Sequence, residues 1–490
     1  MVAILFALML LVLAIHFAVY LRYAFSEVFY PFEIFDAEGI IWQQAMLIPG
    51  PRMYGDIDRY PFLVFHYPPL YHSIVRGLAA LGVDPLIAGR GLSVCASLAA
   101  GVAIGAIVFR FGWDTMGRPR IYGALTAGLV FFCFYPVAAV SPLMRVDMLA
   151  LALSVIGMRC ALESTDAERS LRVAMIFFVL AAFTKQTSIL APLSVMIVVA
   201  SVDPRRALRL LGFGLVLGGV PLACLVWATG GGVLRHLVLY NLNRFEFRLM
   251  VGALREQAVQ AVFVFLAFAA VFVLWRRVCA APEWTGPAAW RDRLRANRTA
   301  QSLSILTIWL VLTTGSLLSL GKSGGGLNYF VEWMAVLSVT IGLLVAAILD
   351  RLTGDPFSNV SRVAILVSLC SQIMLMPASF DYGRANAEDA RTLNSLVDLI
   401  RDAPKPVLSD DMVLSMKAGK GVPMEPAIFL ELTIAGLWDE HRILAMIENR
   451  DFSFVIARSY RLFTPSVAQA IEAAYPRTER RAGHILHFPP

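Results

Sequence analysis

Long apolar runs alternate with short polar stretches over most of the chain, up to about residue 376. The first run, Val2 to Tyr20, is long enough to span the hydrocarbon core of a bilayer, and no Lys or Arg precedes it. A cleaved signal peptide has a basic start and a shorter apolar core, so we expect this segment to remain as a membrane anchor. Further membrane helices are predicted from Pro85 onward and over Tyr122 to Cys160, Val173 to Val202, Leu210 to Trp227, Val259 to Trp275, Leu303 to Leu320, Phe330 to Leu349 and Val363 to Met376.

Arginines gather in four of the loops between these runs, and the positive-inside rule assigns such loops to the cytoplasm. Two loops on the same side need an even number of crossings between them. Tyr122 to Cys160 is therefore predicted to be two helices that turn near Ser141 to Asp147, and Val173 to Val202 two short helices that turn at Thr184 to Thr187. The pattern predicts about eleven crossings, with the N-terminus inside and the C-terminus outside. The basic loops contain Arg110, Arg118 and Arg120; Arg169 and Arg172; Arg205, Arg206 and Arg209; and Arg276, Arg277, Arg291, Arg293, Arg295 and Arg298.

Two segments lack the membrane pattern. Residues 22–84 are polar and hold two modestly amphipathic pieces, Ile34 to Leu47 and Pro68 to Leu81, which suit the plane of the membrane interface. From Ser379 the pattern becomes that of a soluble protein, with several short helices and strands at Pro406 to Ser409 and Ser453 to Ala457. We therefore predict a transmembrane domain over 1–378, with an outer first loop at 22–84, and a small extracytoplasmic α/β domain over 379–490.

Composition supports a polytopic α-helical membrane protein. Of the 490 residues, 58% are hydrophobic and 16% charged, and the mean hydropathy is +0.69. The net charge of +7 lies in clusters between apolar runs, which favours membrane topology over a nucleic-acid partner. The six cysteines fall in apolar runs or in an Arg-rich loop, so none is placed for an exported disulfide.

Polar residues recur at the predicted outer ends of the helices. Because charges at membrane depth are costly, they tend to mark a site or a buried pair, and here they predict a polar cavity. The candidates are Asp36, Glu38, His66 and Tyr67 in the first loop, Arg90 early in the second helix, Arg145 and Asp147, Lys185 and Gln186, Arg244 in the loop from Arg235 to Arg248, and Lys322 to Asn328.

Each candidate has a functional and a structural interpretation. Asp36 and Glu38 suit a general base, or they cap a helix. Arg145 and Asp147 neutralise each other, or they anchor the phosphate of a lipid-linked substrate. Lys185 binds an anion or reaches to the interface.

The remaining candidates surround these acids and cations. His66 and Tyr67 precede a diproline that either frames a pocket or forms a rigid turn. The loop with Arg235, Arg244 and Arg248 lies on the outer side against the sign rule, so a phosphate or lipid headgroups are expected to compensate it. The Gly-rich stretch from Lys322 to Asn328 offers backbone N–H groups and a cation to oxyanions.

Several short motifs, in their order along the chain, resemble those of the GT-C membrane glycosyltransferases. The resemblance is strongest to the bacterial branch related to protein O-mannosyltransferases and aminoarabinose transferases, in glycosyltransferase family 39. It covers most of the membrane region and, more loosely, the C-terminal domain. The motifs are Phe35-Asp36-Ala37-Glu38, Tyr67-Pro68-Pro69-Leu70-Tyr71, Arg90, Arg145-Val146-Asp147, Phe183-Thr184-Lys185-Gln186 and Gly326-Leu327-Asn328-Tyr329-Phe330.

This resemblance implies transfer of a sugar from a polyprenyl-phosphate donor to an acceptor hydroxyl of a lipid, glycan or protein at the outer face, with inversion at the anomeric carbon. It implies Asp36 as the general base and cations that stabilise the departing phosphate. In the aminoarabinose transferases a Lys precedes the diproline, whereas here Tyr67 stands there; Lys185 matches another family lysine. No metal site is predicted, since Asp36 and Glu38 alone do not make a coordination set.

Two other classes of function compete with this interpretation. A multi-pass transporter or flippase of a lipid-linked or anionic substrate also places charges inside a helix bundle. Against it, the sequence shows no inverted repeat, while the acidic first loop and the soluble tail suit an enzyme. A non-catalytic assembly subunit is the third class, and its acidic motif is expected to tolerate replacement.

Overall fold

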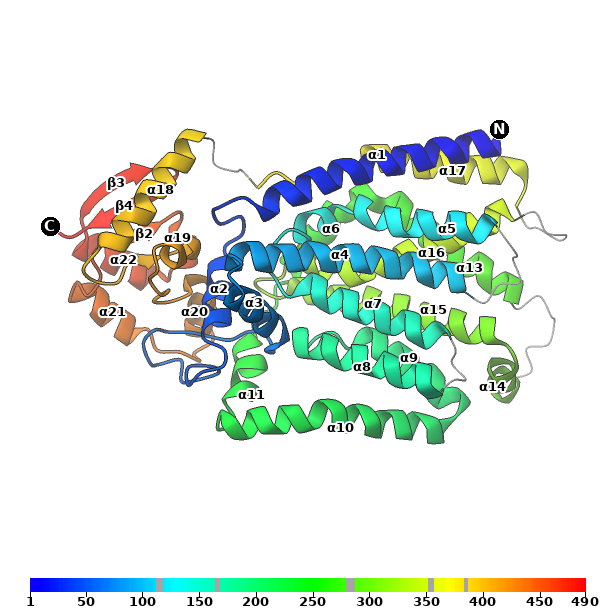
Figure 1. The fold of residues 1–490 in the computed structure, drawn as a ribbon, viewed down its shortest axis with the longest axis horizontal. Coiled ribbons are helices and arrows are strands. Elements are labelled where there is room, and N and C mark those ends of the chain that lie inside the picture. Colours follow the sequence, from blue (N-terminus) through cyan, green and yellow to red (C-terminus); the bar gives the residue numbers. More distant parts are fainter. Residues whose placement is uncertain (112–117, 164–167, 279–286, 351–356, 383–386) are drawn as a thin grey trace.

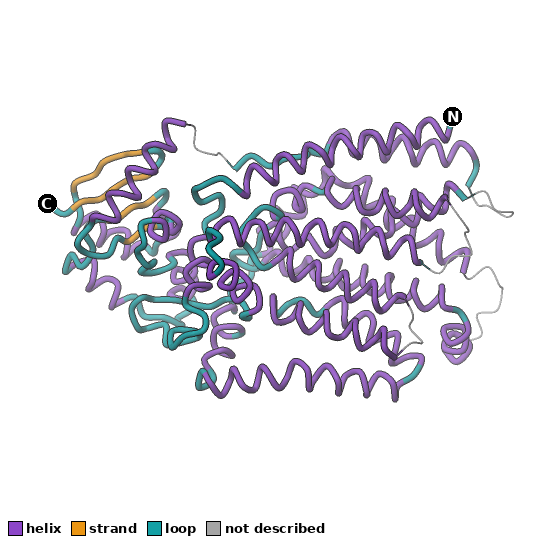
Figure 2. Tube along the Cα trace, viewed as in Figure 1, coloured by secondary structure: helices purple, strands orange, loops and turns teal. Residues whose placement is uncertain are grey.

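The computed structural model describes residues 1–111, 118–163, 168–278, 287–350, 357–382 and 387–490. Most of these residues form a bundle of helices that lie roughly along one direction, and an α/β domain packs at one end of the bundle (Figure 1). Strands are confined to that domain, and most of the long loops lie between it and the bundle (Figure 2). The predicted combination of a polytopic helical membrane fold with a C-terminal α/β domain is confirmed.

Each apolar run predicted to cross the membrane contains at least one helix of the bundle. By length and composition, six helical stretches of the described residues suffice to cross a membrane, and α9 and α17 are shorter apolar helices. The total of eleven crossings stays a prediction. The helices along the bundle are α1 (Val2–Val28), α4 (Pro85–Arg110), α5 (Arg118–Val130), α7 (Asp147–Glu163), α8 (Glu168–Thr184), α9 (Leu190–Val202), α10 (Pro204–Ala228), α13 (Ala261–Val278), α15 (Arg298–Ser316), α16 (Val331–Leu349) and α17 (Asn359–Leu375).

Both predicted breaks in long apolar runs are present. Between α5 and α7 the chain forms a short 3-10 turn and α6 (Tyr135–Val140), and the turn 141–146 leads into α7. Between α8 and α9 the chain turns over residues 185–189. Both turns place polar residues where helices begin or end, so the parity of the basic loops located the two breaks correctly.

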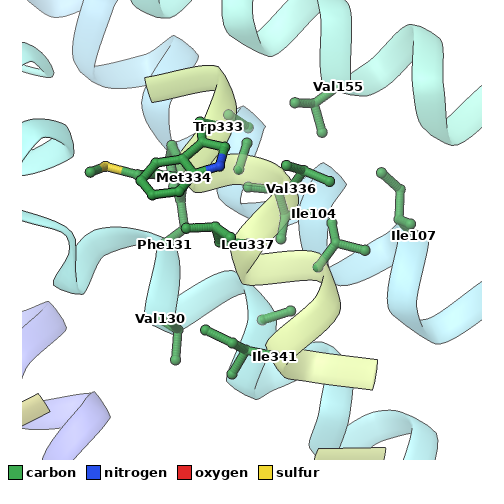
Figure 3. Close-up of a cluster of buried hydrophobic side chains, with 14 of the residues drawn as sticks. Ile104, Ile107, Val130, Phe131, Val155, Trp333, Met334, Val336, Leu337 and Ile341 are labelled. Carbon is green, nitrogen blue, oxygen red and sulfur yellow. The ribbon is translucent and has the colours of Figure 1, made fainter. Parts of the chain in front are cut away.

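Helix α16 forms the centre of the bundle and is buried over almost its whole length. Figure 3 shows Trp333, Met334, Val336, Leu337 and Ile341 of α16 amid apolar side chains of neighbouring helices. The backbones of α5 and α16 approach closely where Gly123 faces Gly342. Small residues allow such contacts between membrane helices, where packing rather than water exclusion drives association.

Short helices lie at the end of the bundle that is next to the C-terminal domain. The two amphipathic pieces of the first loop form α2 (Glu38–Met46) and α3 (Leu70–Ala80), close to their predicted bounds. The segment from Arg235 to Arg248, predicted as a loop, contains the end of α11 (Gly232–Leu237), a 3-10 turn and the start of α12 (Phe247–Glu256). Within it, Phe245 pairs with Lys322 in an antiparallel bridge.

The C-terminal domain is built on a four-stranded sheet in the order β1-β2-β4-β3. β1 pairs in parallel with β2, and the other neighbours are antiparallel. The first two strands were predicted and the β3–β4 hairpin was not. The strands are β1 (Leu408–Ser409), β2 (Val455–Ala457), β3 (Arg477–Arg481) and β4 (His484–Phe488), and the helices are α18 (Ala387–Asp402), α19 (Met412–Lys417), α20 (Pro426–Ile434), α21 (His441–Glu448) and α22 (Pro465–Ala474).

The first loop joins the bundle to the C-terminal domain. The amide Nε2 of Gln43 donates to the carbonyl of Val422 at 3.0 Å, and the backbone N–H of Phe62 donates to the carbonyl of Pro423 at 2.8 Å. The Phe62 ring packs in a buried cluster with apolar side chains of the domain. The first loop therefore holds the C-terminal domain to the bundle by hydrogen bonds to the domain backbone and by a shared apolar core.

The close approach of α5 and α16 makes a stability prediction. An added Cβ at Gly342 would lie 2.5 Å from the Cβ of Ala127 and 2.6 Å from the carbonyl oxygen of Gly123. Overpacking of this kind costs about 1–3 kcal/mol, so Gly342→Ala is expected to lower the thermal unfolding temperature in detergent. Gly212→Ala on α10 is the control, because its Cβ meets nothing within 4 Å and the helix propensity of alanine favours it. Equal unfolding temperatures for the two variants would contradict the close packing.

Candidate functional site

A cavity of about 520 Å³ lies where α7, α9 and α16 begin and where α15 ends. Its walls come from four separate parts of the chain, which the fold brings together at one end of the bundle. Polar and charged side chains interrupt an otherwise apolar lining. These are Asp147 and Ser154, Lys185 to Ser188, Ser316, Ser319, Lys322, Asn328 and Glu332.

Asp147 is the centre of the hydrogen-bond network in this cavity. Its carboxylate side chain has no exposed surface. Oδ1 accepts from the Lys185 ammonium at 2.7 Å and from Asn328 Nδ2 at 2.9 Å, and Oδ2 accepts from Arg145 Nε at 3.0 Å. One carboxylate thus connects the turn before α7, the α8–α9 loop and the segment before α16.

The two cations that bind Asp147 also contact aromatic side chains. The Arg145 guanidinium lies over the ring of Phe35, 4.9 Å from its centroid, and its Nη2 donates to the hydroxyl of Tyr67 at 3.4 Å. The Lys185 ammonium lies 5.4 Å from the ring centroid of Tyr329. Cation–π contacts of this kind orient a charge while leaving part of its surface free for an anion.

The network carries excess positive charge. Arg145, which does not line the cavity, and Lys185 share the Asp147 carboxylate. Lys322 in the lining adds a third cation, for whose ammonium no hydrogen bond or ion pair is found within the described residues. The second acid of the lining, Glu332, accepts from the indole N–H of Trp309 at 2.9 Å. The cavity and the Asp147 network together hold three cations and two acids, and this excess of positive charge favours an anionic ligand.

The pKa values of the two lysines move in opposite directions. Burial acts to lower the pKa of Lys185, but the adjacent Asp147 carboxylate outweighs it and raises the pKa. The pKa of Lys322 is lowered, first by burial and then by repulsion from Lys185. An anion that contacts both ammonium groups would relieve that repulsion.

Asp36 lies outside the cavity lining but next to Phe35, which contacts Arg145, and we call this position the rim of the site. Its side chain is 58% exposed, and Oδ1 is 3.5 Å from Arg458 Nη1 of the C-terminal domain. The adjacent Phe35 is the residue whose ring lies under Arg145. The exposed acid is therefore one residue away from the charge network of the cavity.

Glu38 and Arg90 form a buried clamp. The Glu38 carboxylate accepts from Arg90 Nη2 at 2.6 Å and Nε at 2.8 Å, and from the backbone N–H groups of Ile34 and Met144, each at 2.9 Å. Arg90 also donates to backbone carbonyls after α1, including Phe32 at 2.7 Å. Both side chains are fully buried and neither lines the cavity. They contact each other and the backbone rather than the cavity, and the predicted catalytic role of Glu38 and substrate-binding role of Arg90 stay predictions.

The other predicted residues divide between the cavity and the domain interface. Tyr67, Lys322 and Asn328 belong to the cavity or its network. His66 Nε2 lies 2.9 Å from Oε2 of Glu425 on the C-terminal domain, and the half-exposed Arg244 lies 3.8 Å from Glu431.

The Gly-rich stretch is held by the segment before α12. The backbone N–H of Ser323 donates to the carbonyl of Arg244 at 2.7 Å, and that of Gly325 donates to the carbonyl of Lys322 at 2.8 Å. These N–H groups are thus already bound, although the sequence suggested that they face an oxyanion. The Lys322 ammonium is the part of this stretch that lines the cavity.

A group that sequence reasoning missed surrounds Arg458. Its guanidinium contacts Glu33, Asp36 and Asp411. A signal for it exists, because Arg458 directly follows β2 and Asp410 directly follows β1. The carboxyl ends of adjacent parallel strands meet at one edge of a sheet, where functional residues often gather.

Within the described residues, no group of three or more His, Cys, Asp or Glu side chains is arranged to hold a metal ion. The absence of a metal requirement stays a prediction.

Comparison with known proteins supports the assignment of the fold. No protein-family model matches the chain, and no curated protein does. Among solved structures, the apo form of ArnT from Cupriavidus metallidurans superposes with a TM-score of 0.61 at 15% identity, over 97% of both chains. The chain has the GT-C fold.

Two further structures show this fold with lipid phosphates bound. ArnT from Cupriavidus metallidurans bound to undecaprenyl phosphate matches with a TM-score of 0.58 at 14% identity, over 97% of both chains. The oligosaccharyltransferase AglB from Archaeoglobus fulgidus, in complex with an inhibitory peptide and a dolichol-phosphate, matches with a TM-score of 0.51 at 12% identity, over 94% of this chain and 72% of AglB. The GT-C fold predicted from the short motifs is confirmed.

The Asp147 network makes a second stability prediction. Asp147→Asn removes the counter-charge of two buried cations, and breaking a buried ion pair costs about 3–5 kcal/mol. We expect a clear loss of thermal stability in detergent. Glu479→Gln is the control, because Glu479 and Arg481 form an exposed pair and exposed pairs contribute little. If both variants melt alike, Asp147 does not hold the three segments together.

Proposed function

We propose that the chain is an inverting glycosyltransferase that moves a sugar from a polyprenyl-phosphate donor to an acceptor hydroxyl. The observation that carries the proposal is the cavity together with its Asp147 network, where the three cations Arg145, Lys185 and Lys322 stand against the two acids Asp147 and Glu332. The exposed acid Asp36 lies next to Phe35, whose ring contacts Arg145. The fold shared with ArnT bound to undecaprenyl phosphate supports a lipid phosphate as the ligand. Arg145, Lys185 and Lys322 are the residues assigned to that phosphate.

In the proposed reaction the cations and Asp36 have separate roles. The acceptor oxygen attacks the anomeric carbon, and the bond between that carbon and the phosphate oxygen breaks with its electron pair on the phosphate. The cations stabilise the charge that develops on the leaving group. Asp36 takes the proton of the acceptor hydroxyl. Attack from the face opposite the leaving phosphate inverts the anomeric configuration.

The charge distribution supports an extracytoplasmic reaction. Helix α14 (Pro287–Ala296), with Arg291, Arg293 and Arg295, lies at the end of the bundle opposite the C-terminal domain, as does the N-terminus (Figure 1). The positive-inside rule assigns that end to the cytoplasm. The cavity and the C-terminal domain then face the periplasm, with the N-terminus inside, in a bacterial inner membrane. An outer location gives access to acceptor lipids, glycans and proteins of the cell envelope.

The direct test is sugar transfer by the purified protein in liposomes. With a radiolabelled polyprenyl-phosphate sugar, we expect wild type to transfer label and Asp36→Asn to lose about 100-fold or more in kcat, because general base catalysis contributes that much. Asp56→Asn is the matched control, since Asp56 is another exposed acid of the first loop. Equal transfer by wild type and Asp36→Asn contradicts the assigned base. Movement of the donor across the bilayer without any transfer would favour a flippase.

The lowered pKa of Lys322 predicts the pH dependence of phosphate binding. Because Lys322 loses its proton at a lower pH than an ordinary lysine, the affinity for undecaprenyl phosphate is expected to fall as the pH rises from about 7 to about 10. Lys322→Arg keeps the charge and is expected to lessen the fall. Fluorescence or calorimetric titration in detergent measures this, with Lys405→Arg in the C-terminal domain as the control. The same pH dependence in wild type and Lys322→Arg would exclude Lys322 from the phosphate site.

A further inference from the structure

A second cluster of charged side chains lies between the first loop and the C-terminal domain. Arg458 is its centre. Its Nη2 contacts Glu33 Oε2 at 3.1 Å and also Asp411 Oδ2, and its Nη1 lies 3.5 Å from Asp36 Oδ1. One guanidinium therefore joins two acids of the first loop to an acid of the sheet edge.

The geometry of Arg458 itself is fixed from the domain side. Its backbone N–H donates to both carboxylate oxygens of Asp410, at 2.9 and 2.8 Å. Its Nε donates to His484 Nε2 at 3.1 Å, and Nδ1 of the same ring lies 2.8 Å from the carbonyl of Ala482. The same Nε2 of His484 also lies 3.1 Å from Asp411 Oδ2. His484 and Asp411 thus hold the guanidinium from the domain side, so it presents a fixed direction to the first loop.

The three acids around the guanidinium differ in exposure. The side chains of Glu33 and Asp411 are 0% and 1% exposed, and that of Asp36 is 58% exposed. Asp36 is therefore the member of this trio that an acceptor can reach. The two buried acids hold Arg458 in place, so its guanidinium is already fixed where it contacts Asp36.

The charges of the cluster are strongly coupled. Burial and Asp411 raise the pKa of Glu33, Arg458 acts against them, and Glu38 and Asp36 add to the rise. Burial acts to lower the pKa of Arg458, but Asp411 and Glu33 outweigh it and raise the pKa, so the guanidinium stays charged. The titratable groups that set the electrostatic surroundings of the rim acid are thus Glu33, Glu38, Asp410, Asp411, Arg458 and His484.

We propose that Arg458 is a positioning residue for Asp36: through it the C-terminal domain holds the exposed acid at the rim of the cavity. This inference rests on the proposed function. It assigns the C-terminal domain a part in the chemical step. The contact that docks the domain on the first loop then also orients the base.

The test compares Arg458→Met, Arg458→Lys and Arg461→Met in the liposome transfer assay. Arg461 is the matched control, an exposed arginine three residues further along the same domain. We expect Arg458→Met to lower kcat by about 10- to 100-fold, as misplaced catalytic groups do. Its KM for the lipid-linked donor is expected to stay within about twofold, because the phosphate cations are untouched. Arg458→Lys is expected to restore part of kcat.

A pH profile separates positioning from a merely structural role. Without the guanidinium the carboxylates of the cluster lose a stabilising cation, so the acidic limb of the activity profile of Arg458→Met is expected to move to higher pH. Arg461→Met is expected to keep the wild-type profile. An unchanged profile together with an unchanged kcat in Arg458→Met would overturn the inference.

Arg458→Met also leaves two acids buried without their cation, so a variant that folds is needed beside it. Arg458→Met combined with Glu33→Gln and Asp411→Asn neutralises the buried cluster and is expected to regain thermal stability without regaining kcat. Wild-type activity in this triple variant would show that the cluster serves folding alone and would overturn the inference. A wild type that transfers no sugar from any donor would overturn the proposed function, and this inference with it.

Discussion

The buried carboxylate of Asp147 is the group on which the geometry of the cavity depends. A charge without exposed surface at the end of a membrane bundle is tolerated only when it is compensated. Arg145, Lys185 and Asn328 supply that compensation from three separate segments. Contacts between apolar helices are less directional than these bonds, so the charge network defines how the cavity walls face one another. Because two cations share one acid, the same network that holds the walls also keeps positive charge available for a ligand.

Asp36 and Glu38 belong to one motif, but one side chain is exposed and the other is buried. Glu38 begins α2, and its side chain turns into the protein to meet Arg90 and two backbone N–H groups. Asp36 lies in the turn before α2 and points to the rim, where Arg458 contacts it. The clamp around Glu38 fixes the turn from which Asp36 projects. In this arrangement the buried acid supports the exposed one, and the motif needs both for different physical reasons.

The elements that apolar patterning controls were predictable from the sequence. Long runs gave the bundle helices, and the parity of basic loops located both helix breaks. The β3–β4 hairpin escaped prediction because Arg477–Arg481 is a charged, mostly exposed edge strand without apolar alternation, and its turn uses Ala482 and Gly483 with positive φ. In the site, each cation near Asp147 was predicted from the sequence as a candidate, but the way these cations surround the carboxylate was not. The burial that separates Glu38 and Arg90 from the cavity depends on tertiary packing, which no short motif records.

The ionic cluster around Arg458 had a sequence signal only for its half at the strand ends, because its other half lies in a distant part of the chain. Glu33 and Asp36 belong to the first loop, and Asp411 and Arg458 to the sheet edge. The apolar packing of Phe62 and the pairing of Gln43 with Val422 already hold the domain to the loop. Buried ion pairs add little net stability, because desolvation offsets much of their attraction, but they define geometry sharply. The cluster therefore contributes orientation more than adhesion, and the exposed acid that it contacts is Asp36.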